Sequence, residues 1–324
     1  GIDTQTYRAL SQSPVRPLFN RAFQGQYPPG STLKPFIGLA GLELGTVGAA
    51  ESLTCHGWYT LKNDERRYRD WKKEGHGLTD LDRAIVESCD VYFYDLSLAL
   101  GIDKLHDYLS GFGVGIKTGI DLPGELAGLM PSREWKRRTR NLPWFPGETL
   151  ITGIGQGFML STPLQLAAVT ATLAMRGERF EPQLVYGVKD PNTRQVSASE
   201  PQALTRVNLN EPRHWDTVIN SMERVVHSLR GTARSISQNL NYRIAGKTGT
   251  AQVFGIKQDE EYIKEDIAKK LRDHALFIAF APVDTPRIAV AVIVENGGSG
   301  GAVAAPIARK VMDAWLLGKA HGAG

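Results

Sequence analysis

The chain is organised around the stretch Tyr27-Pro28-Pro29-Gly30-Ser31-Thr32-Leu33-Lys34-Pro35-Phe36. Apolar residues follow it with helical spacing until Gly45, so we expect a helix with Ser31 in its first turn and Lys34 one turn later. Positions three apart share a helix face, and a lysine beside a serine hydroxyl can take its proton. The free N–H groups at a helix N-terminus favour an oxyanion. The stretch therefore predicts a nucleophilic serine, although Ser-x-x-Lys alone also occurs by chance.

Two later motifs turn this local pattern into a signature. Ser88-Cys89-Asp90 and Lys247-Thr248-Gly249-Thr250 follow in the order and approximate spacing of the three motifs shared by penicillin-binding proteins and serine β-lactamases. With these motifs the chain resembles the transpeptidase domain of the class B penicillin-binding proteins, which cross-link peptidoglycan. The resemblance also covers residues 121–125, 153–157 and 162–167. Residues 88–94 make the chain most similar to the elongation-specific members of that class.

The resemblance implies an α+β fold of the penicillin-binding and serine β-lactamase type, in which an antiparallel sheet flanked by helices meets an all-helical lobe. The residue patterns agree, because helical periodicity dominates up to residue 229 and β-branched runs follow at 242–245, 275–281 and 288–294. A terminal helix is expected over 303–317. We expect one transpeptidase domain over residues 1–324, with the catalytic groove between its two lobes along the Lys247 strand.

Several further elements are expected from local signals. Thr79 and Asp80 can cap a helix that pauses at Ser88 and resumes over 91–100. Helices are also expected over 103–112, 160–175 and 211–229, with Pro163 in the first turn of the second of these. Residues 49–79 have little periodicity and indicate a long irregular insertion. Residues 254–270 are charged and pattern-poor, which indicates a mobile loop near the groove.

The resemblance assigns the chemistry of acylation to three side chains. Ser31 attacks the carbonyl of a D-alanyl-D-alanine stem peptide and forms an acyl-enzyme. Lys34 acts as the general base, so burial and the nearby ammonium of Lys247 should depress its pKa. Ser88 relays a proton towards the leaving amine. No cofactor is expected to take part in this catalysis.

The resemblance assigns substrate binding to the third motif. The backbone N–H groups of Ser31 and Thr250 form the oxyanion hole. Lys247, Thr248 and Thr250 hold the substrate carboxylate. We expect residue 249 to be glycine because a side chain there would point into the groove, where the substrate backbone must lie against the strand.

Asp90 departs from the usual second motif, Ser-x-Asn. An ionised carboxylate only accepts hydrogen bonds, whereas an asparagine amide also donates them. Asp90 could pair with Lys34 or with Lys247 and would raise the pKa of that lysine, which opposes its use as a base. The elongation-specific members share this aspartate, so we count Asp90 among the catalytic residues and leave the proton path open.

A metal site is indicated beside the second motif. The chain has two cysteines, Cys55 and Cys89. Asp70 and His76 lie between them, and thiolate, carboxylate and imidazole are ligand types of tetrahedral zinc. We expect these four residues to hold a structural zinc that orders the insertion, with His56 as the alternative imidazole. A disulfide between the cysteines and two separate buried thiols remain open alternatives.

Composition excludes some functions. With 42% hydrophobic and 22% charged residues, the 324-residue chain is an ordinary globular protein. The net charge of +4 and the basic residues at Lys72-Lys73 and 133–140 are attributed to a solvated face, because acidic residues are spread throughout. We therefore expect no nucleic-acid partner.

No apolar run of about 20 residues is present, so the sequence predicts no membrane-spanning helix. The resemblance implies that a cytoplasmic tail, a transmembrane helix and a pedestal domain precede this region. The chain would then be a soluble fragment from the periplasmic face of the bacterial inner membrane, and the full-length protein would work with a membrane-embedded glycosyltransferase of the elongation machinery.

Three functions compete on this scaffold. The first is D,D-transpeptidation of peptidoglycan stem peptides, with β-lactams as covalent inhibitors. The second is a hydrolase, but the glutamate context of class A β-lactamases is missing between the second and third motifs, and the chain is long for that class. The third is a penicillin-binding sensor or an inactive scaffold, and sensors lack the stretch over 153–167 as it stands here. The sequence favours transpeptidation.

Overall fold

The helix that follows Ser31 is buried on all sides. Ser31 lies in a 3-10 turn, Gly30–Leu33, that leads directly into helix α3 (Lys34–Glu43). Every residue of α3 up to Leu42 is buried, as expected for a helix that is apolar around its whole circumference. Gly45 follows the end of the helix with a φ of 62°. The helix is therefore confirmed, although Ser31 precedes the α-helical turns instead of lying within the first one.

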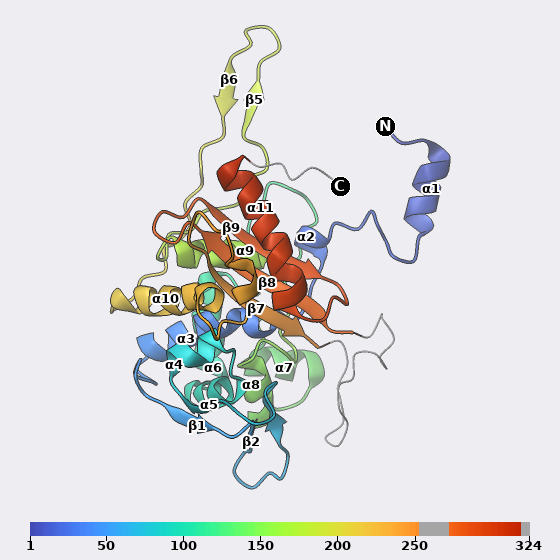
Figure 1. Ribbon diagram of the computed structural model, residues 1–324. Coiled ribbons are helices and arrows are strands. Elements are labelled where there is room, and N and C mark those ends of the chain that lie inside the picture. Colours follow the sequence, from blue (N-terminus) through green and yellow to red (C-terminus); the bar gives the residue numbers. More distant parts are fainter. Residues whose placement is uncertain (253–271, 319–324) are drawn as a thin grey trace.

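The structure is a computed structural model that describes residues 1–252 and 272–318, so the loop expected over 254–270 lies outside the described residues. Around α3 lies a helical lobe (Figure 1). Its helices are α4 (Leu81–Val86), α5 (Asp90–Leu100), α6 (Ile102–Phe112), α7 (Arg133–Arg140) and α8 (Pro146–Thr152). The Asp80 side chain caps α4, and Ser88 takes a positive φ of 60° at the predicted break before α5. Helices α7 and α8 were not predicted, because they are short and carry little apolar periodicity.

The second lobe is a three-stranded antiparallel sheet in the order β7–β8–β9. Its strands are β7 (Ala245–Ala251), β8 (His274–Ala281) and β9 (Ile288–Val294). Helices α9 (Pro163–Ala174) and α11 (Ala305–Leu317) pack on the sheet, while α10 (Arg213–His227) contacts β7, α3 and α4 and so joins the lobes (Figure 1). The strand predicted over 242–245 is wrong except for its last residue. Tyr242 OH instead binds Asp313, and Ile244 N–H binds His227, which ties this segment to helices.

The insertion over 49–79 is less irregular than expected. Strand β1 (Leu53–Cys55) pairs with β4 (Gly77–Thr79), and β2 (Trp58–Tyr59) pairs with β3 (Tyr68–Arg69). These strands are too short to show a period of two in the sequence. They fold the insertion against α5, next to the second motif.

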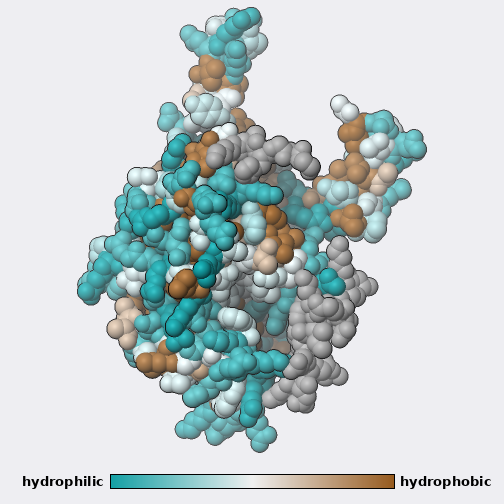
Figure 2. Space-filling view, viewed as in Figure 1, coloured by the Kyte–Doolittle hydropathy of each residue, from teal (hydrophilic) through white to brown (hydrophobic). Residues whose placement is uncertain are grey.

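Smaller elements complete the described chain. Helices α1 (Thr4–Gln12) and α2 (Arg21–Gln24) come first, and the hairpin of β5 (Gly187–Lys189) and β6 (Val196–Ala198) projects from the body (Figure 1). A π-helical turn, Gly300–Ala304, precedes α11. No helix within residues 1–252 and 272–318 is long and apolar enough to cross a bilayer. On the face shown in Figure 2 the surface is mainly hydrophilic, with small separate apolar patches.

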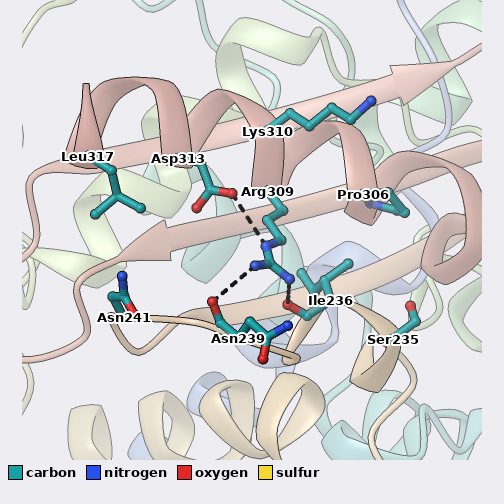
Figure 3. A pocket seen from close by; sticks show the side chains of 9 residues that line it. All are labelled: Ser235, Ile236, Asn239, Asn241, Pro306, Arg309, Lys310, Asp313 and Leu317. Carbon is teal, nitrogen blue, oxygen red and sulfur yellow. Dashed lines mark hydrogen bonds and ion pairs between the residues drawn. The ribbon is translucent and has the colours of Figure 1, made fainter. Parts of the chain in front are cut away.

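Arg309 fastens α11 to the segment after α10. Its guanidinium donates to the carbonyl oxygens of Ile236 at 3.0 Å and Gln238 at 2.6 Å, and it pairs with Asp313 at 3.4 Å. Figure 3 shows the guanidinium reaching from the helix into the shallow pocket between these elements. Each nitrogen of the Arg309 guanidinium has an acceptor, so the residues of this pocket stabilise the packing of α11 in the second lobe.

Main-chain contacts between glycines hold the turn that carries Ser31. Gly30 N–H donates to Gly155 O at 2.8 Å. Both glycines have positive φ, and a Cβ built on Gly155 would lie 2.2 Å from Gly30 O. A side chain at residue 155 would therefore push the loop over 153–157 away from the nucleophile.

We expect Gly155→Ala to lower the free energy of unfolding by about 3 kcal/mol, because it adds an overlap with backbone to the cost of the left-handed conformation. Gly45→Ala is the matched control, since residue 45 also has positive φ but open space around its Cβ. It should cost about 1 kcal/mol. Urea denaturation measures both, and equal losses would show that the contact with Gly30 has no weight.

Candidate active site

The three motifs meet in one cleft of about 600 Å³ between β7 and the helical lobe. Motif residues that line it are Ser31, Ser88, Asp90, Thr248, Gly249 and Thr250. They come from the turn before α3, the break between α4 and α5, and the edge strand of the sheet. The three motifs therefore meet in one cleft, as predicted.

Lys34 bridges the first and second motifs from a fully buried position. Its Nζ donates to Ser88 O at 2.8 Å, to Ser88 Oγ at 3.3 Å and to Asp90 Oδ1 at 2.6 Å. The ammonium also lies 5.4 Å from the centre of the Phe93 ring. Among the described residues, no hydrogen bond joins Lys34 to the hydroxyl of Ser31. Lys34 and Lys247 were both possible partners of Asp90, and the structure shows the ion pair with Lys34.

Two ionisable groups here have displaced pKa values. Burial raises the pKa of Asp90 above its ordinary range, and the Lys34 ammonium opposes that change. Lys247 is fully buried, and its Nζ donates to the carbonyl oxygen of Thr248 at 3.0 Å. Burial, followed by the charge of Lys34, lowers the pKa of Lys247 well below its usual value.

Strand β7 divides its motif between two faces. Side chains alternate along a strand, so Thr248 and Thr250 face one side while Lys247 and Gly249 face the other. A Cβ built on Gly249 would lie 2.7 Å from Thr32 Cγ2 and 3.2 Å from Pro29 O. The expected reason for this glycine is therefore corrected: Gly249 lets β7 pack against the turn of Ser31, and a side chain there would not enter the groove.

Among the cleft residues outside the three motifs, three form hydrogen bonds beside or with motif residues and were not predicted. Trp71 Nε1 donates to the carbonyl oxygens of Glu87 at 3.1 Å and Ser88 at 3.2 Å. Gln156 Nε2 donates to Thr250 O at 2.9 Å, and the hydroxyls of Thr232 and Thr248 are 2.7 Å apart. Only Gln156 lies in a stretch that the sequence analysis quotes. Trp71 follows a predicted metal ligand, which was the one signal available for it, and Thr232 had none.

The four predicted metal ligands lie together and are all buried. The donor atoms of Cys55, Asp70, His76 and Cys89 lie within 4.8 Å of one another. Asp70 Oδ2 is 3.6 Å from Cys55 Sγ, 3.6 Å from His76 Nδ1 and 3.4 Å from Cys89 Sγ. Bonds of 2.0–2.3 Å to tetrahedral zinc place neighbouring ligand atoms roughly 3.5 Å apart. The donor set and its spacing therefore fit this metal.

The cluster adjoins the second motif through Asp70. The same Oδ2 atom accepts from Asp90 N–H at 2.8 Å and from Val91 N–H at 3.1 Å, at the start of α5. The alternative ligand, His56, is exposed and lies outside the cluster. The two thiols are not joined in a disulfide.

Comparisons with known proteins agree with this geometry. The family model described as "Penicillin binding protein transpeptidase domain" matches residues 2–313. Peptidoglycan D,D-transpeptidase MrdA of Haemophilus influenzae is 42% identical over 316 residues, which are 98% of this chain and 48% of that protein. The chain spans about half the length of the curated relatives it matches.

Solved structures extend the similarity to the fold. PBP2 of Pseudomonas aeruginosa, in complex with WCK 5153, is 48% identical with a TM-score of 0.85, over 99% of this chain and 66% of that one. Helicobacter pylori PBP2, in complex with MreC, is 33% identical with a TM-score of 0.83, over 98% of this chain and 55% of that one. The α+β penicillin-binding fold expected from the motifs is confirmed. The chain belongs to the penicillin-binding protein transpeptidase family.

Proposed function

We propose that this chain is the catalytic domain of a peptidoglycan D,D-transpeptidase that cross-links stem peptides during cell elongation and is covalently acylated by β-lactams. The observation that carries the proposal is the position of Ser31 in a cleft, one turn before a buried lysine that holds the second motif. The similarity to proteins named MrdA and PBP2 supports the assignment to elongation.

Acylation forms a bond from Ser31 Oγ to the carbonyl carbon of the penultimate D-alanine. Lys34 takes the hydroxyl proton, and its ammonium must first give up a proton, for which Asp90 is the acceptor within reach at 2.6 Å. The backbone N–H groups of Ser31 and Thr250 receive the oxyanion. As the C–N bond breaks, Ser88 gives its hydroxyl proton to the nitrogen of the departing D-alanine and regains one from Lys34, whose Nζ lies 3.3 Å from Ser88 Oγ. The amine of a second stem peptide then attacks the ester and loses a proton to Lys34, which returns it to Ser31 Oγ as the ester bond breaks.

The cleft walls and the threonines of β7 define the substrate. Thr248 and Thr250 offer hydroxyl groups to the carboxylate of the acyl donor, and the protonated form of Lys247 attracts the same carboxylate from behind the strand. In the full-length protein we propose a membrane anchor, action at the periplasmic face of the inner membrane, and a membrane-embedded glycosyltransferase partner.

A structural zinc is proposed for the buried cluster. The ion would be held by Cys55, Asp70, His76 and Cys89. It would link the insertion to Cys89, the middle residue of the second motif, and so stabilise the fold there. It takes no part in the acyl transfer. Support comes from the burial of four ligand-type side chains whose spacing suits tetrahedral coordination.

Ser31→Ala should abolish covalent labelling by benzylpenicillin while leaving the thermal melting curve unchanged, since loss of a nucleophile costs on the order of a millionfold in rate. Ser11→Ala, on the exposed face of α1, is the control. Intact-protein mass spectrometry follows the adduct for hours after free drug is removed. A lasting adduct on Ser31 supports a transpeptidase, rapid loss indicates a hydrolase, and labelling that survives Ser31→Ala refutes the assignment.

Lys247→Met should stabilise the chain most at low pH. Because burial depresses the pKa of Lys247 in the folded state from 10.5, the unfolded chain binds more protons, and wild-type stability rises with pH between the two values. The advantage of the variant should therefore shrink by about 1.4 kcal/mol per pH unit within that window. Urea denaturation at several pH values measures it. An advantage that is constant with pH would show that Lys247 is charged in both states.

Purified protein should contain about one zinc per chain, and Cys55→Ser or His76→Gln should lose the metal and lower the melting temperature, because the ligands become incomplete. His56→Gln should keep both, since His56 lies outside the cluster. Metal analysis and thermal melting measure this. Metal-free protein with unreactive thiols and a mass about two units low would favour the disulfide instead.

A further inference from the structure

Thr232 is a cleft residue to which no motif gives a role. It lies just after α10, where it contacts Thr248 of β7 and Gly301 of the π-helical turn before α11. A Cβ built on Gly301 would lie 2.3 Å from Thr232 O, and the next residue, Ala233, is buried and donates its N–H to Val225 O at 3.0 Å. This close packing fixes the backbone at Thr232 and therefore the place where its side chain begins.

That side chain meets the third motif. Thr232 Oγ1 lies 2.7 Å from Thr248 Oγ1, and both residues line the cleft. A hydroxyl has one hydrogen and two lone pairs, so one of the two threonines donates to the other. If Thr248 donated, only its lone pairs would face the cleft, and they would repel an anion. If Thr232 donates, the hydrogen of Thr248 is free to point into the cleft.

We propose that Thr232 is a positioning residue that donates its hydroxyl hydrogen to Thr248 Oγ1 and so directs the Thr248 O–H towards the carboxylate of the acyl donor. This inference rests on the proposed function. A donor that is oriented before the ligand arrives costs no reorganisation on binding, and a hydroxyl that accepts one hydrogen bond donates a stronger one. Thr232 therefore acts on anion recognition through Thr248 and does not itself contact the reacting atoms.

The test uses two probes, benzylpenicillin and its methyl ester, in which the carboxylate charge is removed by a single methyl group. The rate of acylation of Ser31 is measured by intact-protein mass spectrometry on the 324-residue chain. Thr232→Val should slow acylation by benzylpenicillin roughly fivefold, the effect of losing one hydrogen bond between uncharged groups. The same change should slow acylation by the ester less than about twofold, and Thr232→Ser should restore both rates because it keeps the hydroxyl.

Thr217→Val is the matched control, because its hydroxyl donates within α10, to Arg213 O at 3.2 Å. If thermal melting shows that Thr232→Val does not fold, the smaller Thr232→Ala takes its place. Equal slowing with both probes would reduce Thr232 to a structural role, and unchanged rates or a failure of Thr232→Ser to restore them would overturn the proposal. Wild-type protein that is never acylated would instead refute the proposed function.

Discussion

The buried ammonium of Lys34 is the constraint on which the active site depends. A charged group removed from water is costly unless strong acceptors surround it. Ser88 O, Ser88 Oγ and Asp90 supply those acceptors, and they come from a segment more than fifty residues away along the chain. The helix of the first motif and the break between α4 and α5 must therefore be assembled together, because neither is satisfied alone.

This requirement extends outward into the insertion. The break between α4 and α5 places Ser88 in a left-handed conformation, and its carbonyl also accepts from the indole of Trp71. Asp70, the neighbour of Trp71, accepts from the first N–H groups of α5. The insertion, which has little periodicity in the sequence, thus supplies hydrogen-bond partners for the backbone of the second motif.

Prediction from the sequence worked best where local chemistry decides the structure. The capped helices α4 and α9, strands β8 and β9 and the meeting of the three motifs follow from caps, periodicity and motif order. Short elements such as α8 and β1–β4 escaped because a few residues carry no period, and their tertiary contacts decide them. The role of Gly249 was misjudged because strand alternation alone does not tell which face packs against the Ser31 turn. Thr232 could not be predicted, because its hydrogen-bond partner, Thr248, lies sixteen residues away in the sequence and is brought next to it by the tertiary fold.

The glycines around the Ser31 turn have an evolutionary consequence. At residues 30 and 155 the nearest atoms are backbone atoms and leave no room for even one carbon, so the nucleophile is placed by main chain against main chain. Such contacts cannot be adjusted in small steps by exchanging side chains. Adaptation to a new ligand or escape from an inhibitor must therefore come through the walls of the cleft, whereas the position of the serine is inherited as a fixed unit.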